Sequence, residues 1–171
     1  ISQYLRNEFS RIRHDHTSRG IPLENDWPGK DSINHLVKKS SGTFIYAATV
    51  VRYIDNEYSH PTERLGSVFS LDPHSTTPLD NLYTQILSAV PDQSILRQVL
   101  HAVVWTNHCW DPEDIDVVLQ LRTGTLRLVL RGLHSVASVP PFTTIEAVRS
   151  GVKLLHASIS DFLLDPLRSS E

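Results

Sequence analysis

One histidine near the end of the chain, His156, occupies a position where it could help to hold an anion. It closes a short extended segment, 153–156, and an apolar helical run over 162–164 follows. Ser158 and Asp161 have the spacing of a capping box, which places a helix start directly after the histidine. Backbone N–H groups and the positive end of the helix dipole gather at such a start. The pattern therefore indicates either a phosphate contact or a plain strand-to-helix junction.

Two other interpretations apply to the same residues. His156, Ser158 and Asp161 are the residue types of a hydrolase triad, but Ser158 lacks the G-x-S-x-G turn that exposes such a nucleophile. Capping explains the spacing of Ser158 and Asp161 better than catalysis does. A histidine can also be a core side chain that bonds a backbone carbonyl. The context in the rest of the chain has to decide between these roles.

The segment 28–32, Pro-Gly-Lys-Asp-Ser, is only superficially like the end of a phosphate-binding loop. The motif G-x-x-x-x-G-K-[ST] requires glycine where Glu24 stands and serine or threonine where Asp31 stands. No strand is expected before it, so we interpret the segment as a helix start. The chain therefore has no Walker A site, and we do not expect it to act as an enzyme that hydrolyses nucleotides on its own.

Two further groups of reactive residue types have structural explanations. Cys109 follows His108 but lacks the second pair of ligands that a zinc site needs, so we interpret it as a small apolar side chain near a helix end. The acids between 111 and 116 mark a helix start, with Asp111 as the cap and its neighbours near the positive end of the dipole. Asp116 is expected to face solvent.

Composition and charge restrict the class of protein. The chain has 171 residues, of which 40% are hydrophobic and 20% charged, as in one folded domain or two small ones. A net charge of −3 does not suggest a nucleic-acid surface, and no apolar run is long enough to cross a membrane. The single cysteine fits a reducing, cytoplasmic compartment. The chain begins with Ile1 and contains no methionine, so we expect it to be a piece of a longer protein.

Apolar residues at helical spacing predict a mainly α-helical fold. The polar stretch 71–78 suggests a division into a helical-bundle subdomain, residues 1–75, and a second subdomain, residues 76–171. In the second, three helices and a two-stranded wing follow the winged-helix order, and Pro140-Pro141 ends the first strand. Helices are expected at 1–16, 31–39, 43–54, 61–69, 79–90, 92–105, 111–119 and 126–133 and after His156, and strands at 136–139 and 153–156.

A winged helix raises DNA binding as an alternative. Its third helix carries Arg122, Arg127 and Arg131, and the last two lie one turn apart on one face. Leucine and valine over 126–133 require burial on much of that helix, and the polar residues that usually read base edges are missing. We therefore expect no nucleic-acid partner, and the arginines are better explained as a solvated or domain-contact face.

Several short segments resemble the region that follows the nucleotide-binding core in fungal NACHT proteins, an NLR-like group. The ordered set covers nearly the whole chain: Trp27-Pro28, 36–50 (LVKKSSGTFIYAATV), 61–65 (PTERL), 82–87 (LYTQIL), 130–136 (LRGLHSV), and 156–158 (HAS) with 161–163 (DFL). The resemblance implies the STAND class of signalling NTPases. It further implies a helical lid followed by a winged helix, both C-terminal to a P-loop core.

In that class the P-loop core holds ADP or ATP, and the helical and winged-helix domains close over it. The resemblance places His156 at the histidine of a Met-His-Asp-type motif, which contacts the nucleotide phosphate in the ADP-bound resting state. Leu155 and Ala157 replace the methionine and the aspartate of that motif. Residues 42–44 fall where related ATPases have Gly-x-Pro, so Gly42 and Phe44 are expected near the base.

The expected function is that of a regulatory lid and latch in a nucleotide-dependent switch for non-self recognition (innate immunity) or programmed cell death. Expected partners are the protein's own P-loop core and sensor repeats, with a homo-oligomer on activation and no membrane. ADP or ATP would be bound by the full-length protein and not by this chain alone. One charge-assisted hydrogen bond is worth about 1.5–3 kcal/mol, enough for one histidine to bias a switch. The alternatives are an autonomous winged-helix DNA-binding module and a ligand-free interaction scaffold.

Overall fold

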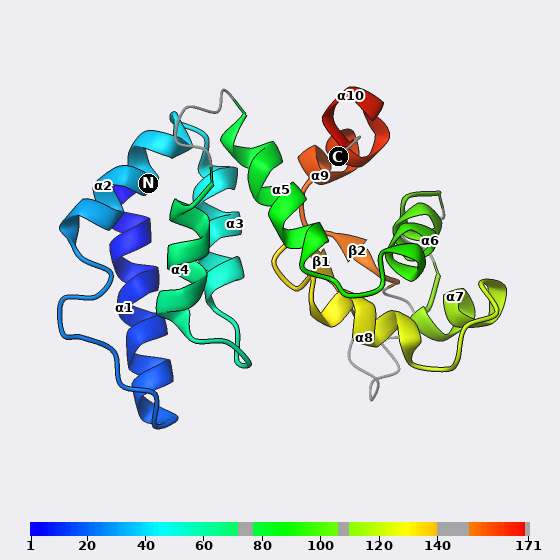
Figure 1. Ribbon diagram of the computed structural model, residues 1–171, viewed down its shortest axis with the longest axis horizontal. Coiled ribbons are helices and arrows are strands. Elements are labelled where there is room, and N and C mark those ends of the chain that lie inside the picture. The colour runs from blue at the N-terminus through cyan, green and yellow to red at the C-terminus, as the bar shows by residue number, and fades with distance from the viewer. Residues whose placement is uncertain (72–76, 106–109, 140–150, 170–171) are drawn as a thin grey trace. The chain divides into compact units, whose positions relative to one another are not determined.

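Figure 1 shows the computed structural model of the chain, in which helices predominate and two short strands pair. The structure describes residues 1–71, 77–105, 110–139 and 151–169, so Cys109 and Pro140-Pro141 lie outside the described residues. The mainly α-helical fold with a small antiparallel hairpin agrees with the sequence prediction. Within these ranges, no helix has the length and apolar character that a membrane span requires.

The chain divides into two compact units, Ile1–Leu82 and Tyr83–Glu171. The sequence predicts a division after residue 75, in the polar stretch, whereas the division found here falls inside helix α5 (Pro78–Ser88). This helix therefore contributes residues to both units.

The first unit packs four helices together: α1 (Ser2–Ser18), α2 (Lys30–Ser40), α3 (Phe44–Ile54) and α4 (Pro61–Phe69). α1 contacts α2 and α3, and α3 also contacts α4. The buried side chains recur at helical spacing, as the sequence predicts, and include Leu5, Phe9, Ile12, Leu36, Val50 and Ile54. Full burial of such a side chain stabilises the fold by about 1.5–3 kcal/mol, so this shared apolar face holds the unit together.

The chain turns sharply between α2 and α3, where the sequence predicts a break. Ser41 has a left-handed backbone conformation with φ 45°, and Gly42 has φ 82°. The Thr43 hydroxyl and the Thr43 N–H both donate to the Ser40 carbonyl, at 2.6 and 2.7 Å. Glycine adopts a positive φ without the steric cost that a side chain would add. The turn thereby fixes the start of α3, where Phe44 is the first residue.

The imidazole of His16, near the end of α1, is buried. It is 1% exposed, and neither ring nitrogen has a partner among the described residues. Burial therefore lowers the pKa of His16 below its ordinary value of 6.5, and the nearby Asp55 carboxylate opposes this effect only in part. The His35 pKa is lowered in the same way.

We expect the first unit to lose stability as the pH falls below about 6.5. Folded His16 resists protonation, whereas the unfolded chain takes up the proton near the ordinary pKa, so acid favours the unfolded state. The free energy of unfolding, measured by urea denaturation between about pH 7 and 5, should decline less steeply in His16→Leu than in the wild type. His14→Leu, at an exposed position on the same helix, is the control and should leave the pH dependence unchanged. An identical decline in the wild type and His16→Leu would contradict the prediction.

The second unit has the element order of a winged helix. Helices α6 (Gln93–Trp105), α7 (Pro112–Val118) and α8 (Thr125–Arg131) precede strands β1 (Ala137–Ser138) and β2 (Lys153–Leu154), and α9 (Ala157–Leu164) and α10 (Pro166–Ser169) follow. In the antiparallel hairpin, Ala137 pairs with Leu154 and Ser138 with Lys153. α8 packs against α6 and α7, and α9 contacts both β2 and α10. The hairpin thus leads directly into α9, where His156 lies.

Asp116 does not face solvent, which corrects the sequence prediction. It is 2% exposed, and its carboxylate accepts hydrogen bonds from the backbone N–H groups of Gly124 (2.6 Å) and Leu126 (2.9 Å). α8 begins after Gly124, which has no side chain to bind the free N–H groups of a helix start. Asp116 therefore caps α8 from the neighbouring helix α7 and fixes the two helices to each other.

Candidate functional site

His156 is the N-cap residue of α9, at the junction that the sequence predicts. Its extended backbone (φ −154°, ψ 146°) follows β2, and its Nδ1 accepts the Ser158 backbone N–H at 3.0 Å. The predicted capping box of Ser158 and Asp161 is therefore wrong, because the Ser158 N–H that such a box would use is already bound to His156. The imidazole itself performs the cap.

A second link ties the imidazole to the core of the second unit. The Ser158 Oγ lies 2.8 Å from the His156 Nδ1 and 2.7 Å from the Tyr83 hydroxyl oxygen. Tyr83 is buried, and its ring packs against Phe162 with centroids 5.5 Å apart. The ring of His156 is thus oriented from α5 through the hydroxyl of Ser158.

The hydrogen bonds assign the proton of the neutral imidazole. Because Nδ1 accepts the Ser158 N–H, it carries no proton, and the ring proton lies on Nε2. The Ser158 hydroxyl lies within hydrogen-bond distance of both Nδ1 and the Tyr83 hydroxyl, and either hydroxyl can be the donor in the contact between them. His156 is exposed, so its Nε2–H is available as a hydrogen-bond donor to a ligand.

Within the part of the chain that the structure describes, the same kind of cap occurs at the start of α4. There the His60 Nδ1 accepts the Thr62 backbone N–H at 3.3 Å. A histidine cap by itself therefore does not mark the candidate site. What distinguishes His156 is the added connection through Ser158 to the buried Tyr83.

The structure brings Ser158 and His156 together but does not complete a hydrolase triad. Among the described residues, none donates a hydrogen bond to the Asp161 carboxylate, and the Nδ1 that would act as the base already accepts a backbone N–H. The Ser158 hydroxyl is held between two partners as part of the cap. The arrangement is therefore suited to orienting an imidazole rather than to activating a nucleophile.

Gly42 and Phe44 lie in the first unit, at the start of α3, whereas His156 belongs to the second unit. Phe44 is 51% exposed, and its ring lies 4.6 Å from the ring of Tyr4 between centroids. A Cβ added at Gly42 would meet nothing within 4 Å, so only the positive φ requires glycine there. Both residues are accessible from solvent at the start of this helix, as a contact with a planar base would require.

Arg127, the central arginine of the DNA-binding alternative, is paired within the protein. Its Nε donates to the Glu113 carboxylate at 2.8 Å, and this ion pair together with a hydrogen bond from Asp111 lowers the pKa of Glu113 to about 2. The ion pair links α7 to α8. It occupies the Arg127 guanidinium, which a DNA-reading helix would need to present to the bases. Arg127 thus has a structural role between helices.

Comparisons with protein-family models, with curated proteins and with solved structures found no match to this chain. Across the described ranges, no three His, Cys, Asp or Glu side chains gather as metal ligands would.

Tyr83 is the site residue that the sequence does not reveal. Its spacing with Leu82 and Ile86 predicts a core position on α5, which is correct, but its hydroxyl binds a residue 75 positions further along the chain. No pattern of neighbouring residues predicts a hydrogen-bond partner so far along the chain. A buried tyrosine usually finds a hydrogen-bond partner, so its presence on an apolar face is the only hint that the sequence offers.

Proposed function

We propose that this chain is the regulatory lid and latch of a nucleotide-dependent STAND signalling switch, of the kind found in fungal NACHT proteins. A P-loop core elsewhere in the protein holds ADP or ATP, and the two units close over it. The chain itself does not hydrolyse nucleotide. It acts in the cytoplasm in non-self recognition or programmed cell death, with its own core and sensor repeats as partners.

One observation carries the proposal: His156 is exposed, and its Nε2 has no hydrogen-bond partner among the described residues, while its Nδ1 accepts the N–H at the start of α9. An exposed N–H donor of this kind suits a phosphate oxygen. The link through Ser158 to Tyr83 limits rotation of the ring, which reduces the entropy cost of the contact. The exposed ring of Phe44, after Gly42, supports a base contact in the same closed state.

A single contact of this kind is sufficient for a switch. A hydrogen bond to a charged group contributes about 1.5–3 kcal/mol, which is a factor of about 10–100 between two states. The nucleotide shifts the equilibrium only by its difference in affinity for the closed and open states. If His156 meets the diphosphate in the closed state alone, ADP holds the switch closed.

The test uses a protein that contains both the P-loop core and this chain. In His156→Asn, the amide oxygen can still accept the Ser158 N–H, so the cap is retained while the Nε2–H donor is lost. We expect ADP to dissociate about 10–100 times faster from this variant, measured with a fluorescent ADP analogue in stopped flow.

His60→Asn is the matched control, because it makes the same substitution at the same kind of cap in the first unit. It should leave ADP dissociation unchanged. Equal dissociation rates for the wild type and His156→Asn would reject the latch and favour the interaction scaffold.

A further inference from the structure

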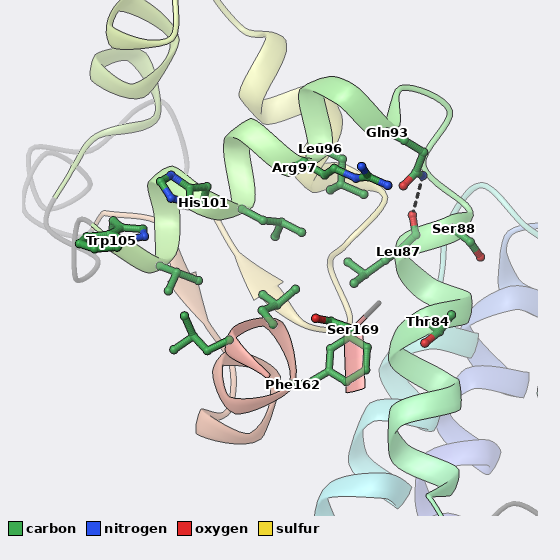
Figure 2. A pocket seen from close by; sticks show the side chains of 14 residues that line it. Thr84, Leu87, Ser88, Gln93, Leu96, Arg97, His101, Trp105, Phe162 and Ser169 are labelled. Atoms are coloured by element: carbon green, nitrogen blue, oxygen red, sulfur yellow. Dashed lines mark hydrogen bonds between the residues drawn. The ribbon is translucent and has the colours of Figure 1, made fainter. Parts of the chain in front are cut away.

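An apolar groove crosses the second unit between α6 and α9 (Figure 2). Its volume is about 500 Å³, and parts of α5 and α10 also line it. Leu96, Leu100 and Val104 of α6 form one wall, and Phe162 and Leu163 of α9 form the other.

The rim on α6 carries polar side chains at every fourth position, which places them on one stripe of the helix. Gln93 closes one end, since its amide donates to the carbonyls of Leu87 (3.0 Å, drawn in Figure 2) and Val90 (2.6 Å). Arg97 and His101 continue the stripe. Arg97 is exposed and forms no ion pair with any described residue, and no aspartate or glutamate lines the groove there. The rim therefore favours an anionic neighbour.

Two large apolar side chains lie exposed at the mouth of the groove. Trp105 of α6 is 74% exposed and Leu164 of α9 is 63% exposed. Covering such surface is favourable by about 25 cal/mol per Å². A partner that fits this groove has an apolar ridge and a carboxylate beside it.

Helix α7 carries such a surface, an apolar ridge with a carboxylate beside it. Val117 and Val118 are exposed, and Asp114 lies three and four positions before them, so the three side chains share one face of the helix. Asp114 is exposed and has no ion-pair partner among the described residues. None of the three lines the groove of its own molecule. The same chain thus carries both a cationic apolar groove and an acidic apolar ridge.

We propose that the groove of one molecule receives helix α7 of a second copy, with Val117 and Val118 against the apolar walls and Asp114 toward Arg97. The two surfaces differ, so the contact is head-to-tail, and each molecule offers one groove and one ridge. The interface is small, and association is therefore weak and dependent on concentration. This contact is independent of the nucleotide switch, because neither surface includes His156, Phe44 or Gly42.

The test measures the mass of the 171-residue chain by sedimentation velocity between about 10 μM and 1 mM. The wild type should associate beyond a dimer as concentration rises. Arg97→Glu blocks the groove and Asp114→Arg blocks the ridge, and each should weaken association about tenfold because attraction is replaced by repulsion. Val117→Asp should abolish association, because it would bury an unpaired carboxylate. All these positions are exposed, and unchanged circular dichroism and melting temperature would show that the variants fold.

Two combinations make the test specific. An equimolar mixture of Arg97→Glu and Val117→Asp retains one intact contact, so it should form heterodimers and stop there. The double variant R97E/D114R should regain association. A wild type that stays monomeric throughout, or association that survives Val117→Asp, would overturn the proposal. A monomeric chain whose groove binds a fluorescent fatty acid would also overturn it and assign the groove to a small amphipathic anion.

Discussion

Replacing Asp116 by alanine should destabilise the second unit by about 3 kcal/mol. The carboxylate accepts two backbone N–H groups, those of Gly124 and Leu126, and the substitution would leave both without this acceptor at the start of α8, where Leu126 is buried and Gly124 is partly buried. An exposed N-cap residue is usually worth about 0.5–2 kcal/mol, so the larger cost reflects burial and the charge. Urea denaturation gives the change in the free energy of unfolding, and hydrogen exchange should show faster exchange at these two amides.

Two variants separate the cap from a general effect of charge on α7. Asp116→Asn keeps one acceptor oxygen but turns an N–H₂ group toward the second donor, so its cost should fall between those of the wild type and the alanine variant. Asp114→Ala, at an exposed position of the same helix, should change stability by at most about 0.5 kcal/mol. A loss below about 1 kcal/mol for Asp116→Ala would show that the cap contributes little.

The helices could be predicted because their signals are local and periodic. Leu5, Phe9 and Ile12 recur at the spacing that buries one face, and α1 forms where this spacing predicts it. Ser41 and Gly42 end α2 for an equally local reason, since the chain needs positive φ there. Such patterns depend on neighbours a few positions away, and a sequence contains all of that information.

The caps could not be predicted with the same success, because the partner of a helix start can come from anywhere. Ser158 is the residue that capping preferences select, yet His156 provides the acceptor for α9. Asp116 looks like one more solvated acid of α7 until the start of α8, which lacks a cap of its own, is placed beside it. The sequence indicates this role of Asp116 only indirectly. A helix that begins after glycine has no side-chain cap at that position, so its first N–H groups need an acceptor from another element.

The position of the candidate site was accessible from the sequence, but its support was not. The sequence places His156 between a strand and a helix, which is correct, whereas Tyr83 contributes through a hydrogen bond across 75 positions. Tyr83 lies on α5, the helix that contributes to both units.

Phe162→Ala should destabilise the second unit by about 3–5 kcal/mol, the range for removal of a buried aromatic ring. Phe162 is 1% exposed, packs against Tyr83 and lies 5.9 Å from the guanidinium of Arg168. It also lines the groove between α6 and α9, so its loss enlarges a cavity that is already present. Hydrogen exchange resolved by peptide should show lost protection in α5, α6 and α9, with little change in α1–α3.

The control for this prediction separates the ring contact from the hydrogen bond beside it. Tyr83→Phe keeps an aromatic ring against Phe162 and removes only the hydroxyl that binds Ser158, so it should cost about 1 kcal/mol. Leu167→Ala, at a nearly fully exposed position of α10, should be neutral. If Phe162→Ala cost no more than Tyr83→Phe, packing would not be what holds α9 in place. The orientation of His156 would then depend on its hydrogen bonds alone, of which Ser158→Ala removes the hydroxyl link to Tyr83 and leaves the backbone N–H bond to Nδ1.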